Sequence, residues 1–160
     1  MATDNKGIVG KLVRVKIGDK YIKCQSDCTV SFNNTFEEGG GCKPDGEDPV
    51  TEASFIDRIL ESQDVQVTVD ARQFLDDLDG ASLTQADIVA RNLTGDVSAE
   101  LEVLTTPGQH SGDNEYLLTI NSVISAIELS YPASGRATSS YTFLGDGTTP
   151  TQSVIPVTGG

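Results

Sequence analysis

Apolar and polar positions alternate with a period of two in two stretches of the middle of the chain, Gln63–Asp70 and Val97–Leu104. This alternation is typical of a β-strand that has one face in a core and the other toward water. The segment between them, which starts at Ser82, has apolar residues at helical spacing instead. The pattern therefore predicts a strand, a helix and a strand in sequence, around which the other strands are arranged.

The helix is expected over about residues 82–94. Ser82 and Gln85 have the spacing of a capping box, and Gly95 stands where a helix C-terminal cap belongs. A single apolar stripe is predicted to face the core, formed by Leu83, Ala86, Val89, Ala90 and Leu93.

Two more strands are predicted near the start of the chain. Lys11–Ile17 alternates, and a Gly-Asp turn leads from it into Tyr21–Cys24, which together predict a hairpin. Thr29–Phe36 is a further strand, with Val30 and Phe32 expected to point inward.

The long run Tyr116–Tyr131 changes its apolar phase part-way along. Its inward positions are even at the start and odd at the end. Since a strand changes face only by adding a residue, a bulge or bend is predicted near Ser122–Ala126. Ala137–Leu144 is expected to return as its partner strand, with Ser139, Tyr141 and Phe143 on one face.

The remaining segments are polar and have no clear period. They are an N-terminal tail (1–9), an acidic glycine-rich loop (37–49), a stretch without assigned structure (51–62), a second loop (106–115) and a C-terminal extension (145–160). We expect the tail, the acidic loop and the extension to be flexible, or to become ordered on a neighbouring molecule.

The chain has 160 residues, which favours one domain, and a formal net charge of −13. That charge argues against binding to nucleic acid or to an anionic membrane surface. No apolar run reaches the about 18 residues that span a membrane, and the polar N-terminus has no signal-peptide core. Synthesis in the cytoplasm is the expectation.

Few residues suggest a catalytic or metal-binding role. Cys24, Cys28 and Cys42 are expected to be free thiols, although one disulfide or three ligands of a zinc ion stay open as alternatives. His110 has no neighbouring nucleophile and carboxylate pattern. The acidic groups at 45–48 and 76–79 lack the spacing of a calcium loop. We predict no catalytic, cofactor or metal site and therefore no enzyme.

The order of these elements resembles that of phage major tail proteins, the tail tube family. The opening Gly10–Ile22 looks like the first hairpin of that family, and the middle strand, helix and strand look like its centre. The pair Ile127–Tyr131 and Ala137–Gly147, which ends in a Gly-x-Gly turn, resembles its closing hairpin. Glu37–Ser62 departs from the family, which usually has a Trp at the start of the following strand, whereas this chain has no Trp.

The resemblance implies a mainly β fold, a β-sandwich or partial barrel of antiparallel strands with one flanking helix. It also implies a structural virion protein, made in the host cytoplasm, that forms hexameric rings stacked into a hollow tail tube. The implied partners are further copies of the chain, a tape-measure protein and tail-tip or terminator proteins. DNA would pass through without specific binding, as an acidic wall favours.

Three sets of residues are candidates for assembly. Polar residues that could face the channel are Gln66, Asp70, Glu100 and Glu102. A sheet edge that a neighbouring subunit could complete includes Leu12, Arg14 and Lys16. A loop that could bridge rings includes Glu37, Glu38, Cys42 and Asp45.

Two other classes remain open from the sequence. A capsid decoration or adhesin-like β-sandwich would present its loops outward without forming tubes. A calcium-dependent module or enzyme would need the acidic groups to bind metal tightly.

Overall fold

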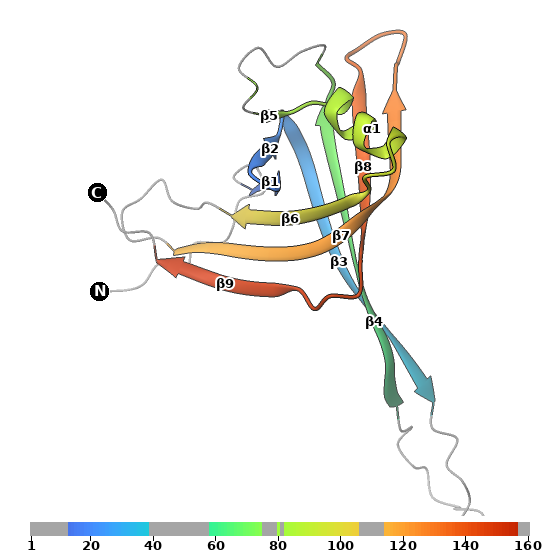
Figure 1. The fold of residues 1–160 in the computed structure, drawn as a ribbon, viewed down its shortest axis with the longest axis vertical. Helices are drawn as coiled ribbons and strands as arrows, with labels where there is room; N and C mark the ends of the chain where they lie inside the picture. The colour runs from blue at the N-terminus through green and yellow to red at the C-terminus, as the bar shows by residue number, and fades with distance from the viewer. Residues whose placement is uncertain (1–12, 39–57, 75–79, 81, 106–113, 157–160) are drawn as a thin grey trace, which may run out of the picture.

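The computed structural model describes residues 13–38, 58–74, 80, 82–105 and 114–156. These residues form nine strands and one helix (Figure 1). In chain order they are β1 (Val13–Ile17), β2 (Lys20–Ile22), β3 (Gln25–Glu38), β4 (Arg58–Arg72), β5 (Ser82–Leu83), α1 (Gln85–Leu93), β6 (Ser98–Thr105), β7 (Asn114–Ser130), β8 (Thr138–Gly145) and β9 (Thr151–Pro156). The prediction of a mainly β fold with one helix is confirmed.

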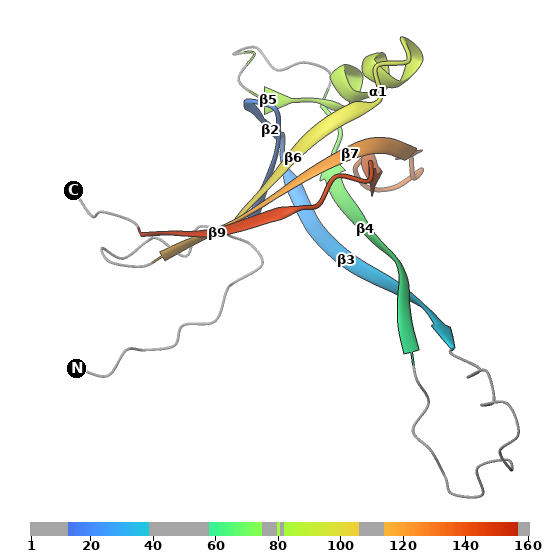
Figure 2. The same ribbon diagram turned by 60° about the horizontal axis from the view of Figure 1, so that its bottom comes forward.

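The strands form one sheet in the order β3-β4-β8-β7-β6-β1-β2-β5, with β9 paired to β7 beside the end of β8. Neighbouring strands are antiparallel, except that β2 and β5 are parallel. The sheet is sharply bent, so β6 and β9 cross the direction of β3, β4 and β8 (Figures 1 and 2). In place of the expected sandwich or partial barrel, the chain has a single bent sheet whose two halves enclose the core.

Strand β7 belongs to both halves of the bent sheet. Its first part pairs with β6 and β9, and its last part pairs with β8. The register with β8 shifts between Ile124 and Ala126, which confirms the bulge predicted from the phase change. Because a bulge adds a residue and increases local twist, it lets one strand turn the corner of the sheet.

The core lies between the two halves of the sheet. Alternate residues of β4, β6 and β8 enter it, as their period of two predicts. The largest fully buried side chains are Tyr141, Phe143, Ile88, Leu101 and Ile120. The predicted inward faces of these three strands are confirmed.

Helix α1 differs from its prediction at the start and in the face that it buries. Thr84, not Ser82, is the N-cap, and the Asp87 carboxylate accepts a hydrogen bond from the Thr84 backbone N–H at 3.0 Å. Ser82 instead lies in β5 beside β2. Ile88 is the fully buried helix residue, whereas Leu93 is 79% exposed.

The apolar stripe predicted for the helix is therefore wrong, because the helix buries a different face. Of that stripe, Leu83 is buried but lies in β5, and Ala86 and Ala90 are exposed. The C-terminal end is confirmed, because Gly95 has φ +81 and the Asp96 N–H donates to the Arg91 carbonyl at 2.9 Å.

The hairpin of β1 and β2 is confirmed, and β3 is longer than predicted at both ends. Phe32 was expected to point inward but is 58% exposed, because β3 and β4 extend beyond the body there. Residues 37–38 and 58–62 are strand rather than loop or unassigned structure.

The C-terminal extension also contains a strand that the sequence analysis missed. Strand β9 pairs antiparallel with the first part of β7, from Thr151 opposite Thr119 to Pro156 opposite Asn114. The tail 1–9, residues 39–57, most of the second loop with His110, and residues 157–160 lie outside the described residues.

Candidate assembly surfaces

The four candidate channel residues lie on two different outer faces. Gln66 and Asp70 are on β4, and Glu100 and Glu102 are on β6. The residues that alternate with them, such as Val67 and Leu101, enter the same core from its two sides. The two outer faces therefore point in different directions, and the two pairs do not form one surface.

Short polar side chains and carboxylates cover the outer face of the β3-β4-β8-β7 half. Asp27, Asp70, Ser140 and Glu128 are successive cross-strand partners in one row. This row lines an open groove of about 810 Å³ at the end of the half-sheet. A neighbouring row carries Thr29, Thr68 and Thr142. Arg72 is a cation at the margin of this face.

Strand β1 is not the free edge that the sequence analysis expected. It pairs along its length with β6 and at Lys16 and Ile17 with β2. Beyond the residues that pair with β2, the Gln25 side chain bonds to the backbone of β1. Its Oε1 accepts a hydrogen bond from the Val15 N–H at 2.8 Å. The edge assignment of Arg14 and Lys16 is therefore wrong, and Leu12 lies outside the described residues.

Other strands do present edges within the described part of the chain. β3 pairs only with β4, and β9 pairs only with β7. The last part of β7, residues 125–130, pairs with β8 but extends beyond the end of β6 on its other side. These backbone edges are where a neighbouring strand could add.

The ends of β3 and β4 form a projecting two-stranded ribbon, which we call the arm (Ser31–Glu38 and Arg58–Asp64; Figure 2). Its described side chains are exposed, among them the large apolar residues Phe32, Phe36, Ile59 and Leu60. Of the predicted inter-ring loop, Glu37 and Glu38 are in the arm, and Cys42 and Asp45 lie outside the described residues.

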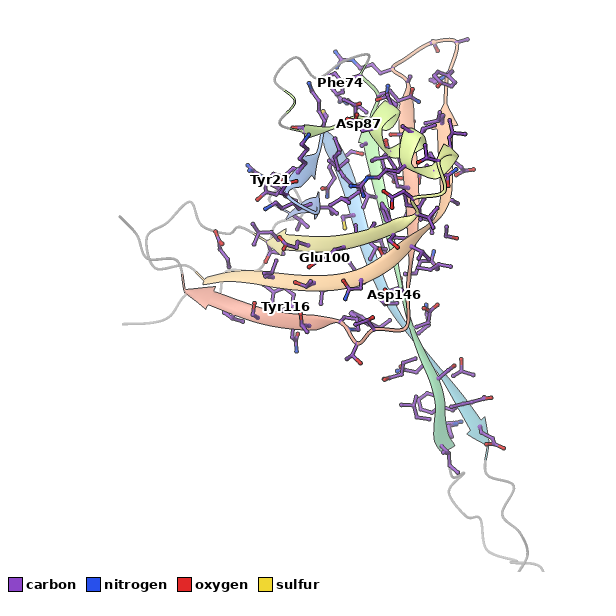
Figure 3. All side chains as sticks on the ribbon, viewed as in Figure 1. Tyr21, Phe74, Asp87, Glu100, Tyr116 and Asp146 are labelled. Atoms are coloured by element: carbon purple, nitrogen blue, oxygen red, sulfur yellow. The ribbon has the colours of Figure 1, made fainter. Side chains whose placement is uncertain are left out.

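The outer side of β1 and β2 concentrates positive charge around aromatic rings. The Arg14 Cζ lies 5.9 Å and the Lys16 Nζ 5.6 Å from the centroid of the Tyr21 ring. The Lys23 Nζ lies 4.8 Å from the centroid of the Phe74 ring. Figure 3 shows Tyr21 at the outer margin of the β1-β2 hairpin. We call Arg14, Lys16, Tyr21 and Lys23 the cationic face.

The two described cysteines are free thiols in different environments. Cys24 is exposed and has φ 53, a left-handed conformation in the turn between β2 and β3. Burial raises the pKa of the Cys28 thiol to about 11. Among the described residues, no three or more His, Cys, Asp or Glu side chains are placed to hold a metal ion.

Neither protein-family models nor curated proteins match this chain. Solved structures do match it over nearly its whole length. The SPP1 tail tube matches with a TM-score of 0.63 and 10% identity, over 96% of this chain and 81% of that chain. The tail of an empty gene transfer agent particle, refined with C6 symmetry, matches with a TM-score of 0.52 and 14% identity, over 98% and 99%.

A sheath-tube complex of an extracellular contractile injection system matches as well. Its TM-score is 0.56 at 11% identity, over 95% of both chains. This chain has the tail tube protein fold. The solved structures that share this fold belong to a virion, a tail tube and a sheath-tube complex. No described helix is long and apolar enough to cross a membrane.

Proposed function

We propose that this chain is a structural virion protein that polymerises as stacked hexameric rings into a hollow tail tube. The observation that carries the proposal is the tail tube fold over nearly the whole chain, shared with a tail that was refined with C6 symmetry. The protein would be made in the host cytoplasm and built into the virion tail, and the genome would pass through the tube to the host.

The outer face of the β3-β4-β8-β7 half is the better candidate for the channel wall. It carries Gln66, the row of cross-strand partners that includes Asp70 and two further carboxylates, and the neighbouring row of threonines. The opposite outer face carries Lys16 beside Glu102, with 4.0 Å between the Lys16 Nζ and the Glu102 Oε2. Because cations bind phosphate and carboxylates repel it, the first face favours passage of DNA without binding.

Ring closure would use the sheet edges that the fold leaves open. A ring of identical subunits needs two different complementary surfaces on each subunit. The outer edge of β3 and the free side of residues 125–130 of β7 bound the same half-sheet on its two opposite sides. Pairing between these edges of adjacent subunits would continue the sheet around the channel.

Further partners follow from the same proposal. A tape-measure protein would occupy the channel during assembly, and tail-tip and terminator proteins would cover the tube ends. The N-terminal tail, the acidic loop with Cys42 and Asp45, and the end of the chain would contact neighbouring rings in the assembled tube.

Negative-stain electron microscopy and solution mass over a concentration series test the proposal. Rings or hollow tubes of uniform width are the expected result, with or without a tail-tip initiator. A monodisperse monomer in every condition would instead support a capsid decoration or adhesin-like module.

Hydrogen exchange tests the edge pairing separately. Backbone amides on the outer edge of β3 should exchange slowly in tubes and quickly in the dilute monomer. Equal protection of these amides in both states would exclude pairing between subunits at that edge.

A further inference from the structure

The cationic face is unusual in a chain whose net charge is −13. Four Lys or Arg residues and one Asp lie between residues 14 and 23. Arg14, Lys16 and Lys23 are on the same side of the hairpin, since they alternate with its inward residues and contact the rings of Tyr21 and Phe74. Arg14 is exposed, and Lys16 keeps solvent access beside Glu102.

The arm has the opposite character. Its described acidic side chains are Glu37, Glu61 and Asp64, against the single cation Arg58. In the sequence, the residues that join its two strands add five carboxylates and one lysine. Apolar Phe36, Ile59 and Leu60 are interspersed with the charged residues and are exposed. Hence the arm offers both charge and apolar area to a partner.

The arm does not reach the cationic face of its own chain. The eight residues Ser31–Glu38 extend about 25 Å at the rise of a strand, and the arm and the β1-β2 hairpin lie at opposite ends of the molecule (Figure 1). At physiological salt, charges separated by more than about 8 Å are largely screened. Within one chain, therefore, neither surface neutralises the other.

We propose that the acidic arm of one copy docks on the cationic face of another copy. This inference rests on the proposed tube and names the surface that receives the arm. The two surfaces are complementary in charge and different from one another, as a head-to-tail contact between identical subunits requires. The aromatic rings of Tyr21 and Phe74 would pack against the apolar side chains of the arm.

A nucleic acid is the competing occupant of a cationic, aromatic face. It is disfavoured because the outer face of the adjoining β6 carries Glu100 and Glu102, and the net charge of the whole chain repels phosphate. An acidic segment of protein is a smaller and more local match for the three cations of the cationic face, Arg14, Lys16 and Lys23.

Charge reversal on each surface tests the docking. The face variant is R14E/K16E and the arm variant is E37K/E61K; each changes the net charge by four units, in opposite directions. The controls are R14E alone, which leaves the Lys16–Glu102 pair intact, and R136E in the exposed turn before β8, which changes the net charge by the same two units as R14E. Circular dichroism and the melting temperature of the monomer verify that each variant is folded.

Assembly is measured by sedimentation and electron microscopy over concentration and salt series. The face variant alone and the arm variant alone should need at least about tenfold more protein to assemble than the unchanged chain, because like charges would then meet in the interface. R136E should assemble as the unchanged chain does, and R14E alone should show a smaller shift than R14E/K16E.

Mixing provides the decisive result. An equimolar mixture of the face and arm variants should assemble at the concentration of the unchanged chain, because each altered surface then meets its complement on the other variant. The quadruple variant R14E/K16E/E37K/E61K should assemble by itself for the same reason.

Failure of this inference is distinguishable from failure of the proposed function. If the unchanged chain never forms rings or tubes, the proposed function fails. If it forms tubes but the two variants assemble normally, or if their mixture does not recover, the docking proposal is overturned. Binding of a fluorescent single-stranded oligonucleotide that R14E/K16E abolishes would assign the cationic face to nucleic acid instead.

Discussion

Replacement of Ile88 by alanine should destabilise the monomer much more than the same change at Leu93. Ile88 has no exposed surface and joins α1 to the core, whereas Leu93 is 79% exposed on the same helix. The pair is informative because the apolar pattern of the sequence places Leu93, and not Ile88, on the inward stripe.

The magnitude follows from the buried volume. Ile88→Ala removes three carbon atoms, each worth about 0.8 kcal/mol of burial, and leaves a cavity between the helix and the sheet. Buried Ile→Ala changes cost about 2–5 kcal/mol in total, and the higher helix propensity of alanine returns only about 0.4 kcal/mol. We expect a loss of about 3 kcal/mol at Ile88, and less than about 0.5 kcal/mol at exposed Leu93.

Urea unfolding of both variants, followed by circular dichroism, measures the two values. The protein concentration must be one at which sedimentation shows a monomer, since assembly would add its own stabilisation. The midpoint of thermal unfolding should fall by about 6–12 °C for Ile88→Ala. Equal losses at the two positions, or a loss under about 1 kcal/mol at Ile88, would refute the assignment of the buried helix face.

Three further predictions concern the helix start, a tight sheet corner and the thiols. Asp87→Ala removes the side-chain acceptor of the helix start and should cost about 1 kcal/mol in urea unfolding; an unchanged midpoint would contradict that role. Gly145→Ala places a Cβ 2.7 Å from a methyl group of Val65 and should cost about 1–3 kcal/mol, whereas a neutral effect would show that the corner can relax. In a variant whose third cysteine is replaced by serine, Cys24 should react with a disulfide reagent at pH 8 much faster than Cys28, because the thiolate is the reactive form and burial raises the pKa of Cys28 to about 11. The Cys28 rate should then rise as pH increases from 8 toward 11, and equal rates for the two thiols at pH 8 would contradict the burial of Cys28.

The candidate assembly surfaces were only partly predictable. The polar positions of β4 and β6 follow from alternation alone, because a period of two fixes which residues share a face of one strand. Alternation does not say how two strands of a bent sheet are oriented relative to one another. For that reason the pattern names Gln66 with Asp70 and Glu100 with Glu102 as polar pairs, but only the structure shows that the two pairs lie on different outer faces.

The edge prediction failed for a related reason. The pattern of Val13, Val15 and Ile17 identifies a strand, but the number of its neighbours depends on partners far away in sequence. β6, more than 80 residues later, covers one side of β1, and β2 with the Gln25 side chain covers the other. Within the described residues, the sheet order thus leaves the open edges on β3, β5, β9 and the end of β7.

By itself, the sequence determined the local features whose physical cause is local. The strands follow from side-chain alternation, the bulge of β7 from a change of phase, and the helix end from a glycine that adopts positive φ without a steric cost.

Only the tertiary structure decided the features that depend on distant partners. The helix turns Ile88 toward the core because the chain enters it from β5, which is paired with β2. Thr151–Pro156 becomes a strand because β7 offers it an open backbone edge, although the side chains of residues 151–154 are exposed. Long-range pairing and packing set these outcomes, and no short window of sequence contains them.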